Sequence, residues 1–217
     1  TQHTDSHTPL DRLVDTVVKH PEHFELPEKV EPPPYYENRP TDPARQAKYR
    51  EAFHRGEELV RQGKVAAFVV AGGQGTRLGW DGPKGTFPAT PIKHKSLFQC
   101  FAEYLLAMSR RYDFDLPFYI MTSPNNDQAT RDFWKKHRYF EMKPENVIFF
   151  AQDQLPAVGF DGKVLLAEKG ALALSPNGHG GSLLALHKSG ALRDMARRGV
   201  TQVSYFQVDN PIVRCID

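Results

Sequence analysis

The sequence predicts an α/β fold in which a mostly parallel sheet is covered by helices on both faces. From Lys64 onward, short apolar runs alternate with amphipathic segments, which is the pattern of strands and helices that follow each other along a chain. The first run, Val65 to Ala71, is apolar at every position, so both faces of that strand are expected to be buried, as parallel sheets require. The residues before Lys64 are polar and rich in proline, and they predict a helical segment that precedes the sheet.

This N-terminal segment is expected to contain two helices joined by an extended strap. Apolar residues spaced at i, i+3, i+4 and i+7 predict a helix over about 9–20. The run 31–36 holds three consecutive prolines and cannot be helical, so it predicts a surface strap, with a proline-rich ligand motif as the alternative. A second helix is expected over about 43–62, ended by Gly63. Its inward residues are expected to be Ala44, Ala47, Ala52, Phe53, Leu59 and Val60.

The elements expected after the first strand follow in alternation. Because strand and helix alternate, the strands are expected to pair in parallel. Helices are predicted over 96–111 and 127–136, and one or two more within 182–198, where Gly190 interrupts the pattern. Strands are predicted over 118–122, 147–151 and 202–208, and a hairpin over 164–167 and 171–174.

Composition excludes several classes of protein. The net charge of +2, from 28 basic and 26 acidic side chains among 217 residues, is too balanced to require a nucleic-acid partner. The longest apolar run has seven residues, well below the roughly 18 of a membrane span, and the first residues carry no secretory pattern. Cys100 and Cys215 lie too far apart in sequence to build a zinc cluster. We therefore expect reduced thiols in a cytoplasmic protein without a membrane partner.

A glycine-rich loop, Ala71 to Gly79, follows the first strand. In a parallel sheet, ligands bind beyond the carboxyl ends of the strands. Three glycines in four positions allow a backbone to approach a ligand closely and to aim its amides at phosphate oxygens, with a flexible turn as the alternative. The dinucleotide fingerprint is excluded because Leu78 stands where its third glycine belongs, and the Walker pattern lacks its Gly-Lys-Ser/Thr.

A short turn, Pro83-Lys84-Gly85, comes a few residues later in the same excursion. A lone lysine is ordinarily a solvated surface charge. Lys84, however, follows Arg77 by seven residues, so the two cations can converge on one polyphosphate.

The loop and this turn resemble the signature of the UDP-sugar pyrophosphorylases, and most closely the eukaryotic-type UDP-N-acetylglucosamine pyrophosphorylases. The resemblance runs from about Tyr49 to the last residue. It implies a Rossmann-like, GT-A-like nucleotidyltransferase fold, with 1–63 as the N-terminal helical segment and 64–217 as the nucleotide-binding part of the catalytic domain. The matching segments are 72–79, 83–85, 119–123, 146–150, 154–157, 160–163, 176–181 and 208–210.

The activity that this resemblance implies is uridylyl transfer. UTP and a sugar 1-phosphate (N-acetylglucosamine 1-phosphate, or a hexose 1-phosphate such as glucose 1-phosphate) give a UDP-sugar and pyrophosphate. The attacking phosphate oxygen is already ionised, so the reaction needs positioning and charge neutralisation by Lys, Arg, backbone amides and Mg²⁺ rather than a general base. The alternatives are a UTP-binding module without turnover and, more distantly, a nicotinamide-dependent oxidoreductase.

The resemblance also implies which residues hold the nucleotide. Lys84 would contact the α-phosphate, with a purely structural role as the alternative. Gln152, at the end of a strand, would read the uracil edge unless it only caps that strand. The remaining nucleotide contacts would be Gly72 and Gly73 against the uridine, Gly75, Thr76 and Arg77 around the β- and γ-phosphates, and the backbone of Gly178 at the uracil.

The metal and the sugar would lie at the end of the last strand. Asp209 would hold Mg²⁺, since a single carboxylate suits an ion that takes its other ligands from water and phosphate, and a helix cap is the alternative. Asn210 would orient the sugar side. Further sugar contacts and a second metal-binding carboxylate are expected beyond Asp217, because the proteins that this chain resembles are longer.

His179 departs from the nearest branch of the family. The turn reads Gly178-His179-Gly180-Gly181, whereas the N-acetylglucosamine enzymes have Asn-Gly-Gly and the UDP-glucose enzymes have Gly-His-Gly. A histidine here could donate to the sugar phosphate, with a core role as the alternative. The sugar 1-phosphate and the oligomeric state are left open.

Overall fold

The computed structural model of the chain describes Asp15 and residues 27–216, and the helix expected over about 9–20 lies outside these residues except for Asp15. The described chain divides into two compact units. One comprises the described residues before Asp42 together with Gln154–Ser175, and the other comprises Asp42–Asp153 with the chain from Pro176 onward.

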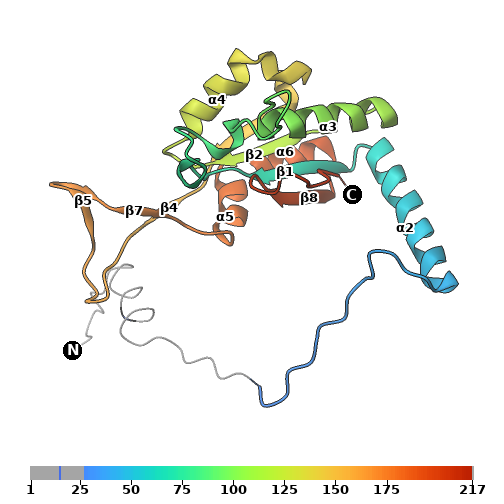
Figure 1. Ribbon diagram of the computed structural model, residues 1–217, viewed down its shortest axis with the longest axis horizontal. Helices are drawn as coiled ribbons and strands as arrows, with labels where there is room; N and C mark the ends of the chain where they lie inside the picture. Colours follow the sequence, from blue (N-terminus) through green and yellow to red (C-terminus); the bar gives the residue numbers. More distant parts are fainter. Residues whose placement is uncertain (1–14, 16–26, 217) are drawn as a thin grey trace, which may run out of the picture. The chain divides into compact units, whose positions relative to one another are not determined.

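A four-stranded parallel sheet forms the centre of the second unit, which confirms the predicted fold class. Its strands are β1 (Val65–Val70), β2 (Phe118–Thr122), β3 (Val147–Ala151) and β8 (Gln202–Gln207). They lie in the order β3-β2-β1-β8, and every neighbouring pair is parallel (Figure 1). The chain thus adds strands on one side of β1 first and then returns to its other side.

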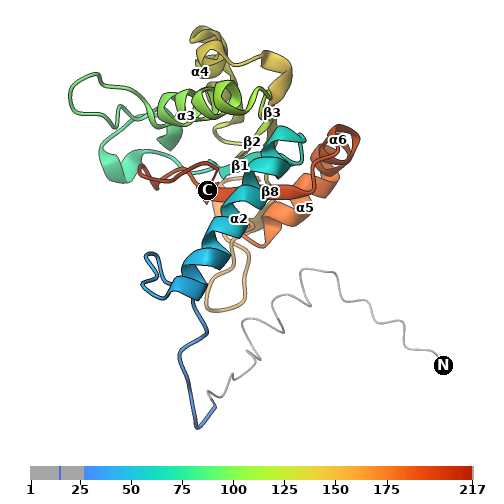
Figure 2. The same ribbon diagram turned by 90° about the vertical axis from the view of Figure 1, so that its right-hand side faces the viewer.

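Helices cover both faces of this sheet. Helices α3 (Leu97–Tyr112) and α4 (Asp127–Lys136) lie on one face, while α5 (Gly181–Lys188) and α6 (Ala191–Arg198) lie on the other (Figures 1 and 2). The last two are the helices expected within 182–198, and Gly190 separates them with a positive φ of 82°.

Alternate residues of β1 fill the two hydrophobic cores. Val65, Ala67 and Val69 pack in the core beneath α3 and α4, and Ala66 and Phe68 pack in the core beneath α5 and α6. The apolar run is therefore buried on both faces, as predicted.

Helix α2 (Pro43–Arg61) has the predicted bounds but not the predicted buried face. Asp42 caps it by accepting from the amide of Arg45 at 3.1 Å. Val60 is buried and Leu59 is partly buried, whereas Phe53 is 56% exposed. The other residues expected to face inward are exposed as well: Ala44, Ala47 and Ala52.

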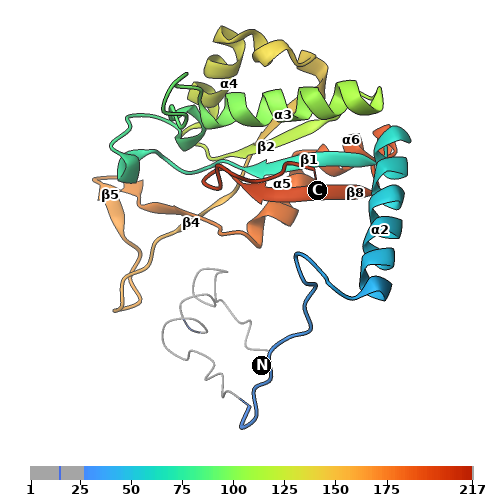
Figure 3. The same ribbon diagram turned by 45° about the vertical axis from the view of Figure 1, so that its right-hand side comes forward.

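The reason for this difference is that the C-terminal turns of α2 pack on the unit, whereas most residues of its earlier turns are exposed. There the Tyr112 hydroxyl of α3 donates to Glu57 at 3.0 Å. Figure 3 shows the earlier turns extending past the edge strand β8. Spacing along a helix predicts which residues share a face, but it does not predict how much of that face another element covers.

The other unit contains short strands and no helix among its residues 27–41 and 154–175. Strand β5 (Leu166–Glu168) pairs in antiparallel fashion with β6 (Ala171–Leu172), which confirms the expected hairpin, and Gly170 takes a positive φ of 88° in its turn. Strand β4 (Gln154–Pro156) neighbours β7 (Leu174–Pro176). The proline run within 31–36 is not helical, as predicted.

Short 3₁₀ helices complete the described structure: η2 (Thr76–Leu78), η3 (Lys84–Thr86), η4 (Arg138–Glu141) and η5 (Pro144–Asn146). The helices in the described part of the chain are all too short or too polar to traverse a lipid bilayer.

Candidate functional site

The carboxyl ends of the four parallel strands meet along one edge of the sheet. Val70 of β1 lies level with Met121 of β2 and with Gln207 of β8, and Thr122 lies level with Ala151 of β3. The loops that follow these strands therefore start side by side. Because the strand order reverses beside β1, a crevice for a ligand is expected where the loops after β1 and β8 diverge.

The glycine-rich loop after β1 folds back on itself. The amide of Gly75 donates to the carbonyl of Gly82 at 2.9 Å, and the amide of Lys84 donates to the carbonyl of Gly73 at 3.0 Å. These bonds return the chain to its starting point and lay the Lys84 side chain over Gly73, so that a Cβ added to Gly73 would lie 3.7 Å from Lys84 Cε. The two parts of the motif thus form one structure.

Lys84 meets Asp209 across 125 residues of sequence. Its Nζ lies 3.3 Å from Asp209 Oδ2, and the two side chains are 20% and 53% exposed respectively. The structure therefore brings together, at the carboxyl ends of β1 and β8, the lysine and the carboxylate that the sequence placed in one site. An ion pair this open to solvent adds little to folding stability.

The glycines of the loop and of the turn after it are needed for different physical reasons. A Cβ on Gly72 would lie 2.6 Å from Gln152 Nε2. On Gly75 it would lie 2.8 Å from Trp80, and on Gly85 it would lie 2.2 Å from the ring of Phe98. Gly75 and Gly85 are therefore required for packing inside the protein, and this reason differs from the close approach to a ligand that the sequence suggested for the loop.

Gln152 continues β3 and turns its amide toward Gly72. Its own backbone amide donates to Thr122 at 2.9 Å, and the residue is 7% exposed. Within the described residues its side-chain amide has no hydrogen-bond partner. The Gln152 side-chain amide is therefore free to bond to a polar ligand edge beside Gly72.

The turn before α5 carries His179 on the surface, which excludes the alternative of a core histidine. Its Nδ1 lies 3.3 Å from Nε2 of Gln207 at the end of β8, and its carbonyl accepts from the Ser182 hydroxyl at 2.6 Å. Beside it, Gly178 has a positive φ of 67°, and no atom lies within 4 Å of the position of an added Cβ. This face of the turn is open.

Arg77, Thr76 and Asn210 are exposed. Arg77 lies in η2, and no ion pair joins it to another residue of the described chain. Its convergence with Lys84 on one polyphosphate stays a prediction. The Asn210 side chain accepts from the amide of Ile212 at 3.3 Å.

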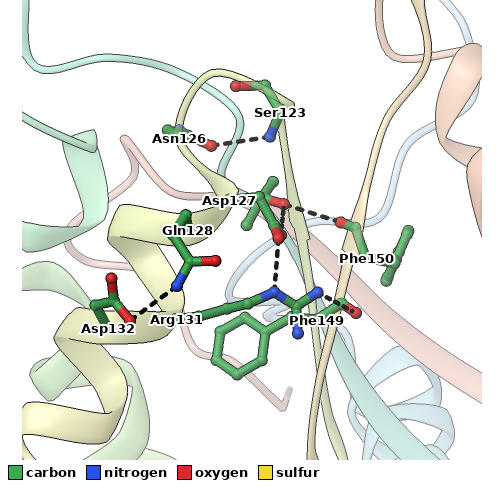
Figure 4. Close-up of polar contacts among 9 residues, drawn as sticks. Ser123, Asn126, Asp127, Gln128, Arg131, Asp132, Phe149 and Phe150 are labelled. Atoms are coloured by element: carbon green, nitrogen blue, oxygen red, sulfur yellow. Dashed lines mark hydrogen bonds and ion pairs between the residues drawn. The ribbon is translucent and has the colours of Figure 1, made fainter.

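Asn126, in the connection between β2 and α4, was not predicted as a site residue. It is 1% exposed, and its Oδ1 accepts from the amide of Ser123 at 2.9 Å (Figure 4). Its Nδ2 donates to the carbonyls of Ala71 and Gly73 at 3.1 and 3.3 Å. An asparagine directly before a predicted helix is expected to be the N-cap of that helix. Nothing in the sequence indicates that it contacts a loop more than 50 residues away.

The donor set at the end of β8 fits Mg²⁺ held mainly by substrate. No group of three or more His, Cys, Asp or Glu side chains gathers into a metal site in the part of the chain that the structure describes. Asp209 alone offers a carboxylate beside Lys84, with half of its surface exposed. One carboxylate suffices for an ion that keeps several waters and binds through phosphate oxygens.

The chain is similar to known proteins in both sequence and structure. The family model described as UTP–glucose-1-phosphate uridylyltransferase matches residues 20–217. UDP-N-acetylglucosamine diphosphorylase 1 of Arabidopsis thaliana is 40% identical over 75% of this chain and 34% of that protein. UDP-N-acetylhexosamine pyrophosphorylase-like protein 1 of Homo sapiens is 40% identical over 82% of this chain and 36% of that protein.

Among solved structures, one from Entamoeba histolytica described as a UDP-N-acetylglucosamine pyrophosphorylase superposes with a TM-score of 0.71 and 36% identity. It covers 77% of this chain, which spans 44% of that one. The chain spans about a third of the length of the curated relatives that it matches.

Proposed function

Because the chain belongs to the UTP–glucose-1-phosphate uridylyltransferase family, we propose that it takes part in uridylyl transfer from UTP to a sugar 1-phosphate. The observation that carries the proposal is the pairing of Lys84 with Asp209 at the reversal of strand order, 3.3 Å apart. It places a cation and a potential metal ligand beside a glycine-rich loop, which is what transfer between two phosphates needs.

In the proposed reaction, an oxygen of the sugar 1-phosphate bonds to the α-phosphorus of UTP. The bond from that phosphorus to the oxygen bridging the β-phosphate breaks, and pyrophosphate leaves. No proton has to move, since the attacking oxygen is ionised at neutral pH. The barrier comes from bringing two anions together in line, so the protein contributes position and positive charge.

We assign the nucleotide roles as follows. Lys84 neutralises the α-phosphate. Arg77, with Gly75 and Thr76, surrounds the β- and γ-phosphates. The uridine lies against the remaining members of the site, which are Gly72, Gly73, Gln152 and the backbone of Gly178. The unpartnered amide of Gln152 beside Gly72 supports this assignment, because a pyrimidine edge supplies both an acceptor and a donor.

Mg²⁺ is the cofactor that we propose, with Asp209 as its protein ligand. When bound, it would neutralise phosphate charge and hold the triphosphate in one conformation. Before the ion binds, the ammonium group of Lys84, which lies against the same carboxylate, neutralises the charge of Asp209.

The sugar has two candidates. The relatives at about 40% identity carry names that specify N-acetylglucosamine or N-acetylhexosamine, which favours an N-acetylated sugar. The Gly-His-Gly sequence at His179, which resembles the turn of the UDP-glucose enzymes, favours a hexose 1-phosphate such as glucose 1-phosphate, and the imidazole is exposed beside Gln207. Asn210 lies on this side of the site. We further propose a cytoplasmic location, in keeping with the two free thiols.

The experiment that tests the function uses the 217-residue chain with Mg²⁺. UTP binding is measured by calorimetry, and pyrophosphate release is measured with N-acetylglucosamine 1-phosphate, glucose 1-phosphate and galactose 1-phosphate in parallel. Release with one of these sugars supports the proposal and identifies the sugar. Binding without release would support a nucleotide-binding module, and no binding of UTP would overturn the proposal.

A further inference from the structure

Asn126 is a buried side chain that reaches from one loop into another. Its amide makes three hydrogen bonds, one to the Ser123 amide of its own connection and two to the carbonyls of Ala71 and Gly73. At 1% exposure it has almost no contact with solvent. Although it directly precedes α4, its side chain makes no capping bond to that helix.

The partners of Asn126 fix the orientation of its amide. The Ser123 amide is a donor and faces Oδ1, while two carbonyl acceptors face Nδ2. Turning the amide over would set donor against donor and acceptor against acceptor. Asn126 therefore acts on the glycine-rich loop specifically as a hydrogen-bond donor.

The two bonded carbonyls determine where the loop's amides point. In a trans peptide the C=O and the following N–H point in opposite directions. Since the carbonyls of Ala71 and Gly73 face Asn126, the amides of Gly72 and Gln74 face away from it. Within the described chain, no acceptor takes the amides of Gly72, Gly73 or Gln74. Of these three, the amides of Gly72 and Gln74 are free donors on the side opposite Asn126.

We infer that Asn126 is a positioning residue, which holds the peptides 71–72 and 73–74 so that the amides of Gly72 and Gln74 are presented to acceptors of the bound nucleotide. The inference rests on the proposed function for the identity of the ligand. Free, convergent backbone amides are suited to phosphate oxygens and to a uracil carbonyl, which are the acceptors that UTP offers.

Asn126→Asp is the sharpest test because it keeps the shape of the side chain. A carboxylate still accepts from Ser123, but it has no donor for Ala71 and Gly73 and repels both carbonyls. The matched control is Asn125→Asp, the same change on the exposed neighbour. Asn126→Ser, which shortens the side chain without adding a charge, replaces Asn126→Asp if that variant does not fold.

Calorimetry with UTP and with uridine gives the first readout. Asn126→Asp is expected to weaken UTP binding about tenfold or more, the scale of losing buried hydrogen bonds. Asn125→Asp is expected to stay within twofold of the parent chain. The uridine titration shows whether the base or the phosphates lose their donors. Asp194→Asn, which removes the charge that pairs with Arg198 on the opposite face of the sheet, controls for a loss of stability that leaves binding intact.

Amide spectra give a second readout that needs no ligand. In ¹⁵N-labelled protein, the resonances of Gly72 and Gln74 are expected to move, and their heteronuclear NOE to fall, in Asn126→Asp but not in Asn125→Asp. A folded Asn126→Asp with unchanged Gly72 and Gln74 resonances and parental UTP affinity would overturn the inference. If the parent chain does not bind UTP, the proposed function fails, and the ligand-free spectra still decide the role of Asn126.

Discussion

Lys84 is held in place by its neighbours on three sides. Its amide donates to Gly73, its ammonium group pairs with Asp209, and the residue after it packs against the ring of Phe98. A long, flexible side chain is therefore given a defined direction by the short turn that carries it. This is what a group that stabilises a transition state requires, because its charge must already be in place when the reaction begins.

Replacing Lys84 by alanine is expected to lower pyrophosphate release by about a hundredfold or more, the effect of losing one donor to the transition state. The control is Lys93→Ala, which removes an exposed lysine from another loop. Initial rates with saturating UTP and sugar 1-phosphate measure the difference. Near-parental turnover in Lys84→Ala would remove the lysine from the mechanism.

Gly85 gives a prediction about stability alone. A methyl group there would lie 2.2 Å from Phe98, and that ring is enclosed in the core, so Gly85→Ala is expected to cost about 1–3 kcal/mol of unfolding free energy. Gly56→Ala is the matched control, since no atom lies within 4 Å of its added Cβ in the middle of α2. It is expected to raise stability by about 0.5–1 kcal/mol.

Urea denaturation of Gly85→Ala and Gly56→Ala shows directly whether each substitution raises or lowers the unfolding free energy. Equal effects from the two substitutions would show that the turn yields to Phe98 without cost.

At the scale of elements, single side chains join the helices to the sheet. Arg131 of α4 bonds to Asp127 at 2.6 Å and donates to the Phe149 carbonyl of the edge strand β3 at 3.0 Å, as Figure 4 shows. On the opposite face, Asp194 of α6 accepts from the Tyr119 hydroxyl of β2 at 2.8 Å and from Arg198 at 2.7 Å. Both helices are therefore fixed to the sheet by polar bonds as well as by apolar packing.

Asp194 is expected to make stability depend on pH. Burial by itself would raise the pKa of its carboxyl group, but the hydrogen bonds from Arg198 and Tyr119 outweigh it and hold the pKa below the usual value. A group whose pKa is lower in the folded state stabilises the protein above its unfolded pKa of about 3.9, and this stabilisation is lost as the pH falls through the folded pKa.

Asp194→Asn is therefore expected to lower Tm by several degrees at pH 7, and the difference from the parent is expected to shrink below about pH 4. Asp132→Asn, on the exposed side of α4, is the control and is expected to change Tm little. Thermal scans between pH 3 and pH 8 measure both. A difference in Tm between Asp194→Asn and the parent that stays constant from pH 3 to pH 8 would contradict a lowered pKa of Asp194 in the folded state.

For the molecule as a whole, the sequence was sufficient to predict the parallel sheet, because three of its strands, β1, β2 and β3, are apolar runs that end at a polar loop. The meeting of Lys84 with Asp209 follows from that topology. The contacts of Gly75 with Trp80 and of Asn126 with Gly73 could not be predicted, since they depend on how loops fold against one another. The exposure of the α2 face that was expected to be buried was not predicted, because helical spacing does not show whether another element covers that face.

The two thiols report on the integrity of the whole fold. Cys215 is fully buried, and burial raises its pKa to about 12, whereas Cys100 is partly exposed with a pKa raised mainly by burial. Since the thiolate is the reactive form, native protein at pH 8 is expected to react with a disulfide reagent slowly at Cys100 and not at Cys215 until it unfolds.

The Cys100→Ser variant isolates the second thiol. Its reaction rate is expected to follow the fraction of unfolded protein as urea is added. Rapid labelling of native Cys100→Ser would show that the C-terminal residues open without global unfolding.

The place of β8 beside β1 has a consequence for the order in which the protein assembles during synthesis. Lys84 leaves the ribosome 125 residues before Asp209 does, so one edge of the central strand β1 has no partner while the rest of the sheet is made. Contacts this distant in sequence close late and slowly. A nascent chain therefore gains its candidate site only after β8 has docked beside β1.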